Sequence, residues 1–379
     1  MNERAHFERL ETTAETPSEL FEHFEAESYE GRTYYLLPDA RHGVERGTVV
    51  VPDADVVVRG YPSVPRVLVL DPGVRSFFAD GETVAVEEKL DGYNVRIAAL
   101  GADEVEPFAF TRGGYVCPYT TGRARARLDL SSFFADHPEK VLCAELVGPE
   151  TPYTSHDYDD VASHAFRVFG VRDRESGEPL PVARRRDLCA AYGFDQPRLF
   201  GRYELSEAVD RVRRTIDRLD DERREGVVMK SADGTSMVKY TTEAQHHAEL
   251  AYAFGLPFDC GRDFLFSRVV RDAFQAAELD EDDERLRERA HDLGESILLP
   301  MVDTIDDVAA GETVGERRTV RGESPEVDAL LDHLRDQSLT LEVVSDRHED
   351  GERVVEFLTV AESTQDRIRY YLDGGTRDE

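Results

Sequence analysis

Residues 83–100 read TVAVEEKLDGYNVRIAAL, and this stretch decides the fold. Apolar and polar residues alternate around Leu90-Asp91-Gly92, which is typical of two short β-strands. An Asp-Gly pair supplies the positive φ angles of a tight hairpin turn. We therefore expect a β-hairpin in which Lys89 lies at the end of the first strand.

Residues 225–240, EGVVMKSADGTSMVKY, predict a second hairpin. Lys230 comes just before the turn sequence Ser-Ala-Asp-Gly, and Lys239 lies on the returning strand. Glu225 and Lys230 are five positions apart, which places them on opposite faces of an ideal strand. One of them is therefore expected to lie outside the strand or beyond a bulge.

Lysine is rare in this chain. Only four of the 46 basic residues are lysine, at positions 89, 140, 230 and 239, and the other 42 are arginine. Three of the four lie in the two predicted hairpins, either as ordinary strand-end surface residues or as functional groups. Burial and neighbouring cations can lower the pKa of lysine until a neutral, nucleophilic amine forms. Arginine stays protonated and cannot act in this way. The pattern favours a lysine that attacks phosphorus while nearby cations neutralise a triphosphate.

Six short elements resemble, in the right order, the motifs of the covalent nucleotidyltransferases, the superfamily of ATP-dependent ligases and capping enzymes. They are Lys89-Leu90-Asp91-Gly92, Thr111-Arg112-Gly113-Gly114, Glu145-Leu146-Val147-Gly148-Pro149, Phe166-Arg167-Val168-Phe169, Glu225-Gly226-Val227-Val228-Met229-Lys230 and Val238-Lys239-Tyr240. The layout of the whole chain is similar to that of the archaeal homodimeric ATP-dependent RNA ligases. One such element is weak support, whereas six in order over about 150 residues are strong support.

The resemblance implies a role for each matching residue. Lys89 would be the nucleophile that takes AMP from ATP, and Glu225 would help to hold a divalent ion, Mg²⁺ or Mn²⁺, both of which suit carboxylate and phosphate oxygens. The residues implied in nucleotide binding are Glu88 near the adenine amino group, Phe169 stacked on the base, Asn94, Arg112 and Glu145 at ribose or phosphate, and Lys230 and Lys239 at the phosphates. Many ligases carry K-x-K in the last element, where this chain has Met237, and Arg96 is a candidate for the missing cation.

The reaction implied is the joining of an RNA 5′-phosphate to a 3′-hydroxyl. The adenylate would move from Lys89 to the RNA 5′-phosphate, and the 3′-hydroxyl would then displace AMP. The alternatives are a DNA ligase, a capping-type guanylyltransferase, and a nucleotide-binding or RNA-binding protein that keeps the fold without turnover. The stretch after Tyr240 lacks the successive short strands of the OB-fold that accompanies many DNA ligases, which favours RNA.

The predicted fold is α+β. Its centre is a nucleotidyltransferase (ATP-grasp-like ligase) domain of antiparallel sheets with flanking helices, accompanied by a small β-containing N-terminal domain, a helical domain and a C-terminal α/β domain. The expected boundaries are 1–70, 71–240, 241–317 and 318–379, with helices near 182–193 and 205–224. Residues 241–317 are the expected contact of a homodimer.

The composition is strongly acidic, with 79 Asp and Glu residues and a net charge of −33. Because 40% of the residues are hydrophobic and spread along the chain, it is a folded acidic protein rather than a disordered one. Acidic excess with scarce lysine resembles a halophilic archaeal protein of the cytoplasm, with activity that rises with salt. No C-x-x-C pair suggests a zinc site, and no apolar run is long enough for a membrane span.

Two groups of basic residues have simpler explanations. Arg123, Arg125 and Arg127 recur at every second position, so they could form a strip for RNA phosphates, but a solvated edge is at least as plausible. His246 and His247 have no metal-ligand spacing. We assign these histidines no role from the sequence.

Overall fold

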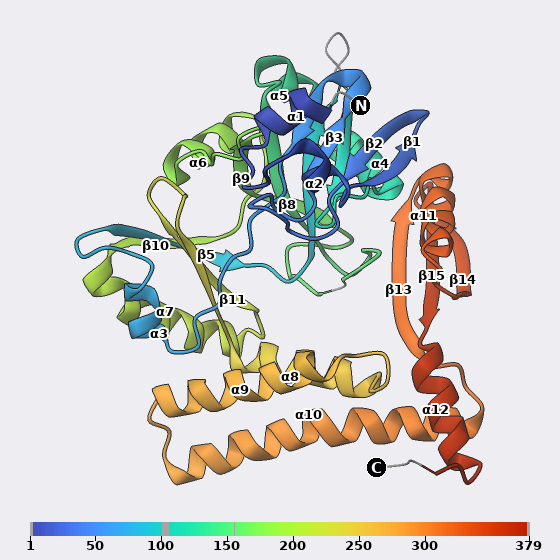
Figure 1. Cartoon of the computed structure of the whole chain (residues 1–379). Helices are drawn as coiled ribbons and strands as arrows, with labels where there is room; N and C mark the ends of the chain where they lie inside the picture. The colour runs from blue at the N-terminus through green and yellow to red at the C-terminus, as the bar shows by residue number, and fades with distance from the viewer. Residues whose placement is uncertain (1–2, 101–105, 155, 377–379) are drawn as a thin grey trace.

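The computed structural model describes residues 3–100, 106–154 and 156–376, which form four sheets and the helices around them (Figure 1). The N-terminal part contains α1 (Glu3–Arg9), α2 (Pro17–Phe21), a 3₁₀ turn (Pro52–Ala54) and a sheet of β1 (Glu25–Tyr29), β2 (Arg32–Leu36), β3 (Val49–Val51) and β4 (Val56–Val58). Every strand pair described in the four sheets is antiparallel. The predicted α+β class with antiparallel sheets is confirmed.

Two further sheets form the centre of the molecule. One has the order β10-β5-β11-β12, with β5 (Thr83–Lys89), β10 (Leu199–Glu204), β11 (Gly226–Ser231) and β12 (Met237–Thr241). The other has the order β7-β6-β8-β9, with β6 (Tyr93–Ala99), β7 (Pro107–Thr111), β8 (Lys140–Val147) and β9 (Ala165–Asp173). Strands β11 and β12 pair directly, as the predicted second hairpin requires.

The predicted first hairpin is wrong, because β5 and β6 belong to different sheets. Residues 90–92 carry the chain from one sheet to the other, and neither Asp91 nor Gly92 has a positive φ. A Cβ atom at Gly92 would lie 2.7 Å from the carbonyl oxygen of Leu146, so the glycine permits close approach to β8 rather than a turn. Lys89 still ends β5, and it therefore lies where the chain passes between the two sheets.

Helices cover the outer faces of these sheets. Against β10-β5-β11-β12 pack α3 (Leu70–Arg75) and α7 (Leu205–Asp221), and the remaining helices of this part are α4 (Pro118–Arg127), α5 (Leu130–Asp136) and α6 (Val182–Ala191). The predicted helices near 182–193 and 205–224 are confirmed as α6 and α7. In α7 the buried apolar residues recur at helical spacing and contact Val86, Val227 and Met229 of the sheet. One face of the β10-β5-β11-β12 sheet is therefore buried against these helices, and the opposite face is available for a binding site.

Three helices follow β12 directly and lie below the central sheets in Figure 1, namely α8 (Glu243–Gly255), α9 (Arg262–Glu278) and α10 (Asp283–Ala310). The C-terminal part contains β13 (Gly315–Gly322), α11 (Ser324–Asp336), β14 (Leu341–Glu349), β15 (Glu352–Val360) and α12 (Glu362–Leu372). The expected boundary at 318 falls inside β13, whose sequence GERRTVRG has no clear alternation of apolar and polar residues. None of the helices in the described ranges is long and apolar enough to cross a membrane.

Arg123 has neither of the two roles weighed from the sequence. It lies on helix α4, not on a strand, and its side chain is 3% exposed. Its guanidinium forms ion pairs of 2.6 Å with Glu326 and 2.6 Å with Glu352 from the C-terminal part. Arg123 therefore fixes the C-terminal sheet to the central domain, where Tyr119 also donates a hydrogen bond to the carbonyl of Arg321.

Candidate active site

A cavity of about 440 Å³ lies between the two central sheets. It is lined by Tyr61, Val64, Glu87, Glu88, Lys89, Leu90, Gly92, Tyr93, Asn94, Arg112, Glu145, Phe169, Pro197, Val228, Lys230 and Lys239. Most of the residues that the sequence predicted for the nucleotide site are among them. The cavity is large enough for a nucleotide-sized ligand.

Strand register explains why the lysines share this cavity. Lys89 pairs with Gly226, while Val228 pairs with Glu87 on one side and with Lys239 on the other. Paired residues of adjacent strands point to the same face of a sheet. The face opposite helix α7 therefore presents all these side chains to the cavity.

Lys89 is held by an acidic partner. Its Nζ atom lies 2.5 Å from Oε2 of Glu225. Burial alone would lower the pKa of Lys89, but the carboxylates of Glu225 and Glu145 outweigh it, so the pKa is raised. The sequence predicted the opposite direction because it considered the neighbouring lysines and not the acids. Without a ligand, Lys89 is therefore a protonated amine.

Glu225 lies just before β11 rather than within it, which confirms that Glu225 and Lys230 do not share one regular strand. The backbone between them turns at Gly226, whose φ is +146°. A Cβ atom at Gly226 would lie 2.3 Å from the carbonyl oxygen of Tyr240. Glycine is needed here because only glycine combines this φ with so close an approach. The turn directs the Glu225 carboxylate toward Lys89.

Glu145 supplies a second carboxylate on the opposite sheet. It lies on β8 opposite Asn94 of β6, and both side chains line the cavity. Burial raises the pKa of Glu145 to about 8, partly offset by the positive charge of Lys89. In the described residues, no group of three or more histidine, cysteine or acidic side chains could enclose a metal. A divalent ion held by Glu225 and Glu145 would take its other ligands from phosphate and water, as Mg²⁺ usually does.

Lys230 is paired with a residue that the sequence reading missed. Its Nζ atom donates hydrogen bonds of 2.9 Å to Oε2 of Glu87 and 2.9 Å to the carbonyl oxygen of Phe169. Glu87 is 1% exposed and also pairs with Arg185. Despite burial, Lys230 and Arg185 lower the pKa of Glu87 to about 2. Strand alternation from Lys89 could have revealed Glu87, because residues two apart on a strand share a face.

A bulge in β9 explains the position of Phe169. Gly170 pairs with Cys143 and Val168 with Ala144, so Phe169 has no partner of its own on β8. A bulge of this kind re-aims one side chain. Phe166 is buried in the core, whereas Phe169 lines the cavity beside Tyr61, with their ring centroids 5.2 Å apart. No local pattern in the sequence pointed to Tyr61.

Two residues predicted to bind the nucleotide, Arg96 and Glu88, have side chains that pair with other parts of the protein. The fully buried Arg96 is absent from the cavity lining and donates hydrogen bonds of 2.7 Å to the carbonyl of Arg59 and 2.6 Å to that of Gly47. It therefore joins the N-terminal sheet to β6 and does not replace the lysine missing at Met237. Glu88 touches the cavity, but its carboxylate pairs at 2.7 Å with Arg224 on the other face of β5.

Arg112 and Lys239 form the basic part of the lining. Arg112 lies in the turn after β7, and Lys239 lies on β12. Burial, assisted by the positive charges of Arg66 and Lys89, lowers the pKa of Lys239 to about 8. Two residues before Lys239, the sulfur of Met237 accepts a hydrogen bond of 3.3 Å from the Tyr61 hydroxyl, so this position carries no charge toward the cavity.

Family models match most of the chain. The RNA ligase model matches residues 82–241, and this range contains the strands of both central sheets that line the cavity. The model described as the C-terminal region of the ligase Pab1020 matches residues 252–375. The two matches cover the central domain and the helical and C-terminal parts separately.

Similar proteins extend this agreement to the full length. An uncharacterized protein of Methanocaldococcus jannaschii is 39% identical over 343 residues, covering 88% of this chain and 85% of its own. A structure of an archaeal ATP-dependent RNA ligase is 40% identical, with a TM-score of 0.91 and 100% coverage of both chains. A putative ATP-dependent DNA ligase from Aquifex aeolicus, 24% identical with a TM-score of 0.86, covers 94% of this chain and 97% of its own and shares the fold. The chain belongs to the family of archaeal ATP-dependent RNA ligases.

Proposed function

We propose that this RNA ligase joins RNA ends through a covalent Lys89–AMP intermediate. The observation that carries the proposal is the position of Lys89, which ends a strand at the floor of the cavity between acidic and basic groups. Glu225 and Glu145 are its acidic neighbours, and the cationic side chains of Lys239 and Arg112 line the same cavity. This arrangement suits a nucleophile that must lose a proton beside a polyphosphate.

In the first step the Lys89 nitrogen attacks the α-phosphorus of ATP. A nitrogen–phosphorus bond forms, the bond to the pyrophosphate oxygen breaks, and pyrophosphate leaves. Lys89 must first give up a proton, and Oε2 of Glu225, 2.5 Å away, is the nearest acceptor. A divalent ion at Glu225 and Glu145 would balance charge on the phosphates. It would also reduce the stabilisation that these carboxylates give to the protonated amine of Lys89.

The cavity lining offers different side chains to the base and to the phosphates of ATP. Phe169 and Tyr61 offer aromatic surface for the adenine, and Asn94 offers an amide to the ribose or α-phosphate. Arg112 and Lys239 are cations of the same lining, and a triphosphate needs such cations. Lys230 also lines the cavity, and its amine donates a hydrogen bond to Glu87. If Lys230 contacts a phosphate, the amine would therefore bind the phosphate and the Glu87 carboxylate together.

The second and third steps use the same groups. An RNA 5′-phosphate oxygen attacks the adenylate phosphorus, the bond to Lys89 breaks, and the RNA carries AMP. A 3′-hydroxyl then attacks the RNA 5′-phosphorus and AMP leaves. The substrate is thus RNA with a 5′-phosphate and a 3′-hydroxyl.

Labelling tests this chemistry directly. The wild type, Lys89→Ala and Lys140→Ala are incubated with α-labelled ATP and Mg²⁺ or Mn²⁺ in concentrated KCl, then separated by denaturing electrophoresis. Lys140 is a matched control because it pairs with Glu139 and Asp173 outside the cavity lining. We expect a labelled band in the wild type and Lys140→Ala and none in Lys89→Ala.

Other results would contradict parts of the proposal. A band that persists in Lys89→Ala would assign the adenylate to another residue. Labelling by GTP alone would favour a capping-type enzyme, and faster sealing of DNA than RNA ends would favour a DNA ligase. A stable adduct without end joining would favour a binding protein.

We also propose that the chain is a homodimer in an archaeal cytoplasm rich in salt. Large apolar side chains are exposed on α9 and α10, among them Phe266, Leu298 and Leu299. Exposed apolar residues gathered on neighbouring helices are typical of subunit contacts. The net charge of −33 supports solubility in concentrated salt.

A further inference from the structure

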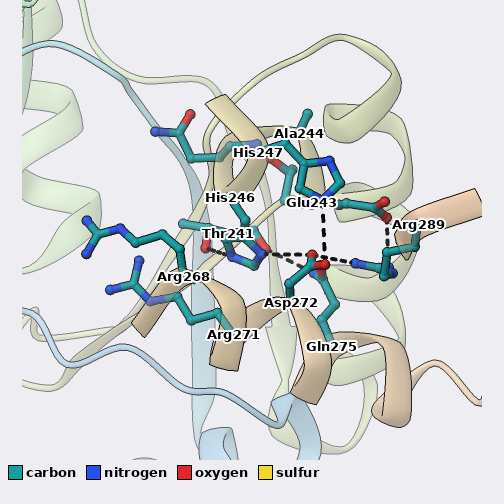
Figure 2. A network of polar contacts seen from close by, with 12 residues as sticks. Thr241, Glu243, Ala244, His246, His247, Arg268, Arg271, Asp272, Gln275 and Arg289 are labelled. Carbon is teal, nitrogen blue, oxygen red and sulfur yellow. Dashed lines mark hydrogen bonds and ion pairs between the residues drawn. The ribbon is translucent and has the colours of Figure 1, made fainter. Parts of the chain in front are cut away.

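Three arginines lie next to Lys239, at the junction of the central sheet with the helical part. Arg66 pairs with Lys239 in a parallel β-bridge, so the two side chains share a face. Arg268 and Arg271 lie one turn apart on α9, and in Figure 2 both extend to the same side. Each of the three shows electrostatic coupling to the others or to Glu249.

The carboxylates around this group are too few to neutralise it. Arg268 Nε lies 2.5 Å and Arg271 Nη1 lies 3.3 Å from the same atom, Oε2 of Glu249. Arg66 donates to the hydroxyl of Thr241 and, in the described ranges, forms no ion pair within 4.0 Å. Lys239 also lacks an acidic partner within that distance in the part of the chain described. Glu225 also acts on Arg66, Arg271 and Lys239, but its carboxylate is paired with Lys89 at 2.5 Å, so the four cations outnumber the carboxylates near them.

Partly buried cations that outnumber their counter-charges are costly, and a chain of net charge −33 has ample acid to pair them elsewhere. Burial lowers the pKa of Arg66, and burial with the charges of Arg66 and Arg268 lowers the pKa of Arg271 to about 10. An excess of positive charge kept in place beside a catalytic cavity is characteristic of an anion site. Guanidinium groups are the side chains best matched to phosphate oxygens.

A buried network holds this arrangement rigid. Asp272, next to Arg271, accepts a hydrogen bond of 2.8 Å from Arg289 of α10 and lies 3.6 Å from Nδ1 of His246. His246 is in turn 2.9 Å from the Thr241 hydroxyl at the end of β12, and Gln275 donates to the Thr241 carbonyl (Figure 2). The network ties α8, α9 and α10 to β12. It therefore fixes the guanidinium groups of α9 relative to Lys239.

We propose that Arg66, Arg268 and Arg271 form with Lys239 a phosphate-binding site that supplies the cations absent at Met237. This inference rests on the proposed function for its choice of ligands. These are phosphates that must lie beside the reacting α-phosphate, either the pyrophosphate end of ATP or the 5′-phosphate of the RNA. Both sources offer the same oxyanion chemistry to the arginines.

Binding measurements distinguish the two sources. Arg66→Gln, Arg271→Gln and the wild type are titrated with inorganic pyrophosphate, with AMP, and with short RNA carrying either a 5′-phosphate or a 5′-hydroxyl. We expect each variant to bind its phosphate ligand about tenfold more weakly, equivalent to about 1.4 kcal/mol, with AMP within about twofold of the wild type. Weakening for pyrophosphate assigns the site to ATP, and weakening for 5′-phosphate RNA alone assigns it to the RNA end.

Two controls separate charge from stability. Arg214→Gln removes an exposed arginine of α7 and should bind every ligand as the wild type does. Glu249→Gln removes the shared carboxylate and should tighten phosphate binding about threefold, a change that loss of stability would not produce. Thermal unfolding of every variant is followed in parallel.

The inference is overturned if Arg66→Gln and Arg271→Gln bind both pyrophosphate and 5′-phosphate RNA within twofold of the wild type. That result, together with normal adenylation of Lys89, would leave the ligase function intact and remove only this site. If the two variants bind pyrophosphate more weakly but the wild type never forms the adenylate, the phosphate site stands and the ligase function falls. The two failures are therefore distinguishable.

Discussion

Around Lys89 the cavity is acidic, whereas around Lys239 it is basic, although both lysines lie on one face of one sheet. Burial alone would lower the pKa of each. At Lys89 the carboxylates of Glu225 and Glu145 reverse that effect, while at Lys239 the charges of Arg66 and Lys89 reinforce it. The pKa values of these two lysines therefore differ because of their neighbouring charges and not because of burial.

This difference suits the two ends to different tasks in the proposed reaction. There the acidic end accepts the proton of Lys89 and holds a divalent ion, and the basic end holds the leaving phosphates. Lys230 represents a third case, because Glu87 neutralises it inside the same cavity. Substitutions at each of these three places test how far the local charges matter.

The largest effect on the reaction rate is expected at the acidic end. Glu225→Gln removes the proton acceptor beside Lys89 and a carboxylate that suits a divalent ion. We expect the rate of Lys89 adenylation to fall about 100-fold or more, equivalent to about 2.7 kcal/mol in activation free energy. Single-turnover labelling with ATP measures this rate.

Glu207→Gln is the matched control for that change, since Glu207 is exposed on α7 and outside the cavity lining. It should adenylate at the wild-type rate. If Glu225→Gln stayed within threefold of the wild type, the acidic end would have no part in activating Lys89.

An effect on stability rather than on the reaction rate is expected where Glu87 pairs with Lys230. Glu87→Gln leaves Lys230 and Arg185 buried without their carboxylate, which should lower the free energy of unfolding by about 3–5 kcal/mol at neutral pH. Chemical denaturation measures the loss. In Glu87→Gln/Lys230→Met the cost should be partly recovered, because the unpaired ammonium is gone.

The same pair predicts a pH dependence. The pKa of Glu87 falls from 4.5 to about 2 on folding, so its stabilising contribution is present above pH 4.5 and is lost as the pH falls toward 2. The difference in unfolding free energy between wild type and Glu87→Gln should narrow over this range. A constant difference from pH 7 to pH 2 would show that the pair adds no pH-dependent stability.

The smallest effect is expected from salt. The net charge of −33 repels RNA and ATP at long range, although the basic end attracts phosphate at short range. Because salt screens exposed, distant charges more than buried, close ones, we expect end joining to rise with KCl by less than about tenfold. Steady inhibition by KCl from low concentration upward would contradict this and indicate ordinary counterion release.

Much of the site could be predicted from the sequence. Three of only four lysines, two glutamates and the order of six short elements identified Lys89, Glu145, Glu225, Lys230 and Lys239, all placed in or beside one cavity. The periodicity of α7 and the β11–β12 hairpin were also predictable, because local sequence determines both. Arg96 and the Asp-Gly turn were misjudged, since their roles depend on strands distant in the sequence.

The residue types needed for the chemistry, and most of the segments that form strands and helices, are evident in the amino-acid sequence. Which charges become neighbours depends on the folded structure. The sheet change at residues 90–92, the bulge at Phe169 and the packing of α9 on β12 give Lys89 acids and Lys239 arginines. The physical reason is that electrostatic shifts depend on distance through space, and folding sets those distances between residues far apart in the chain.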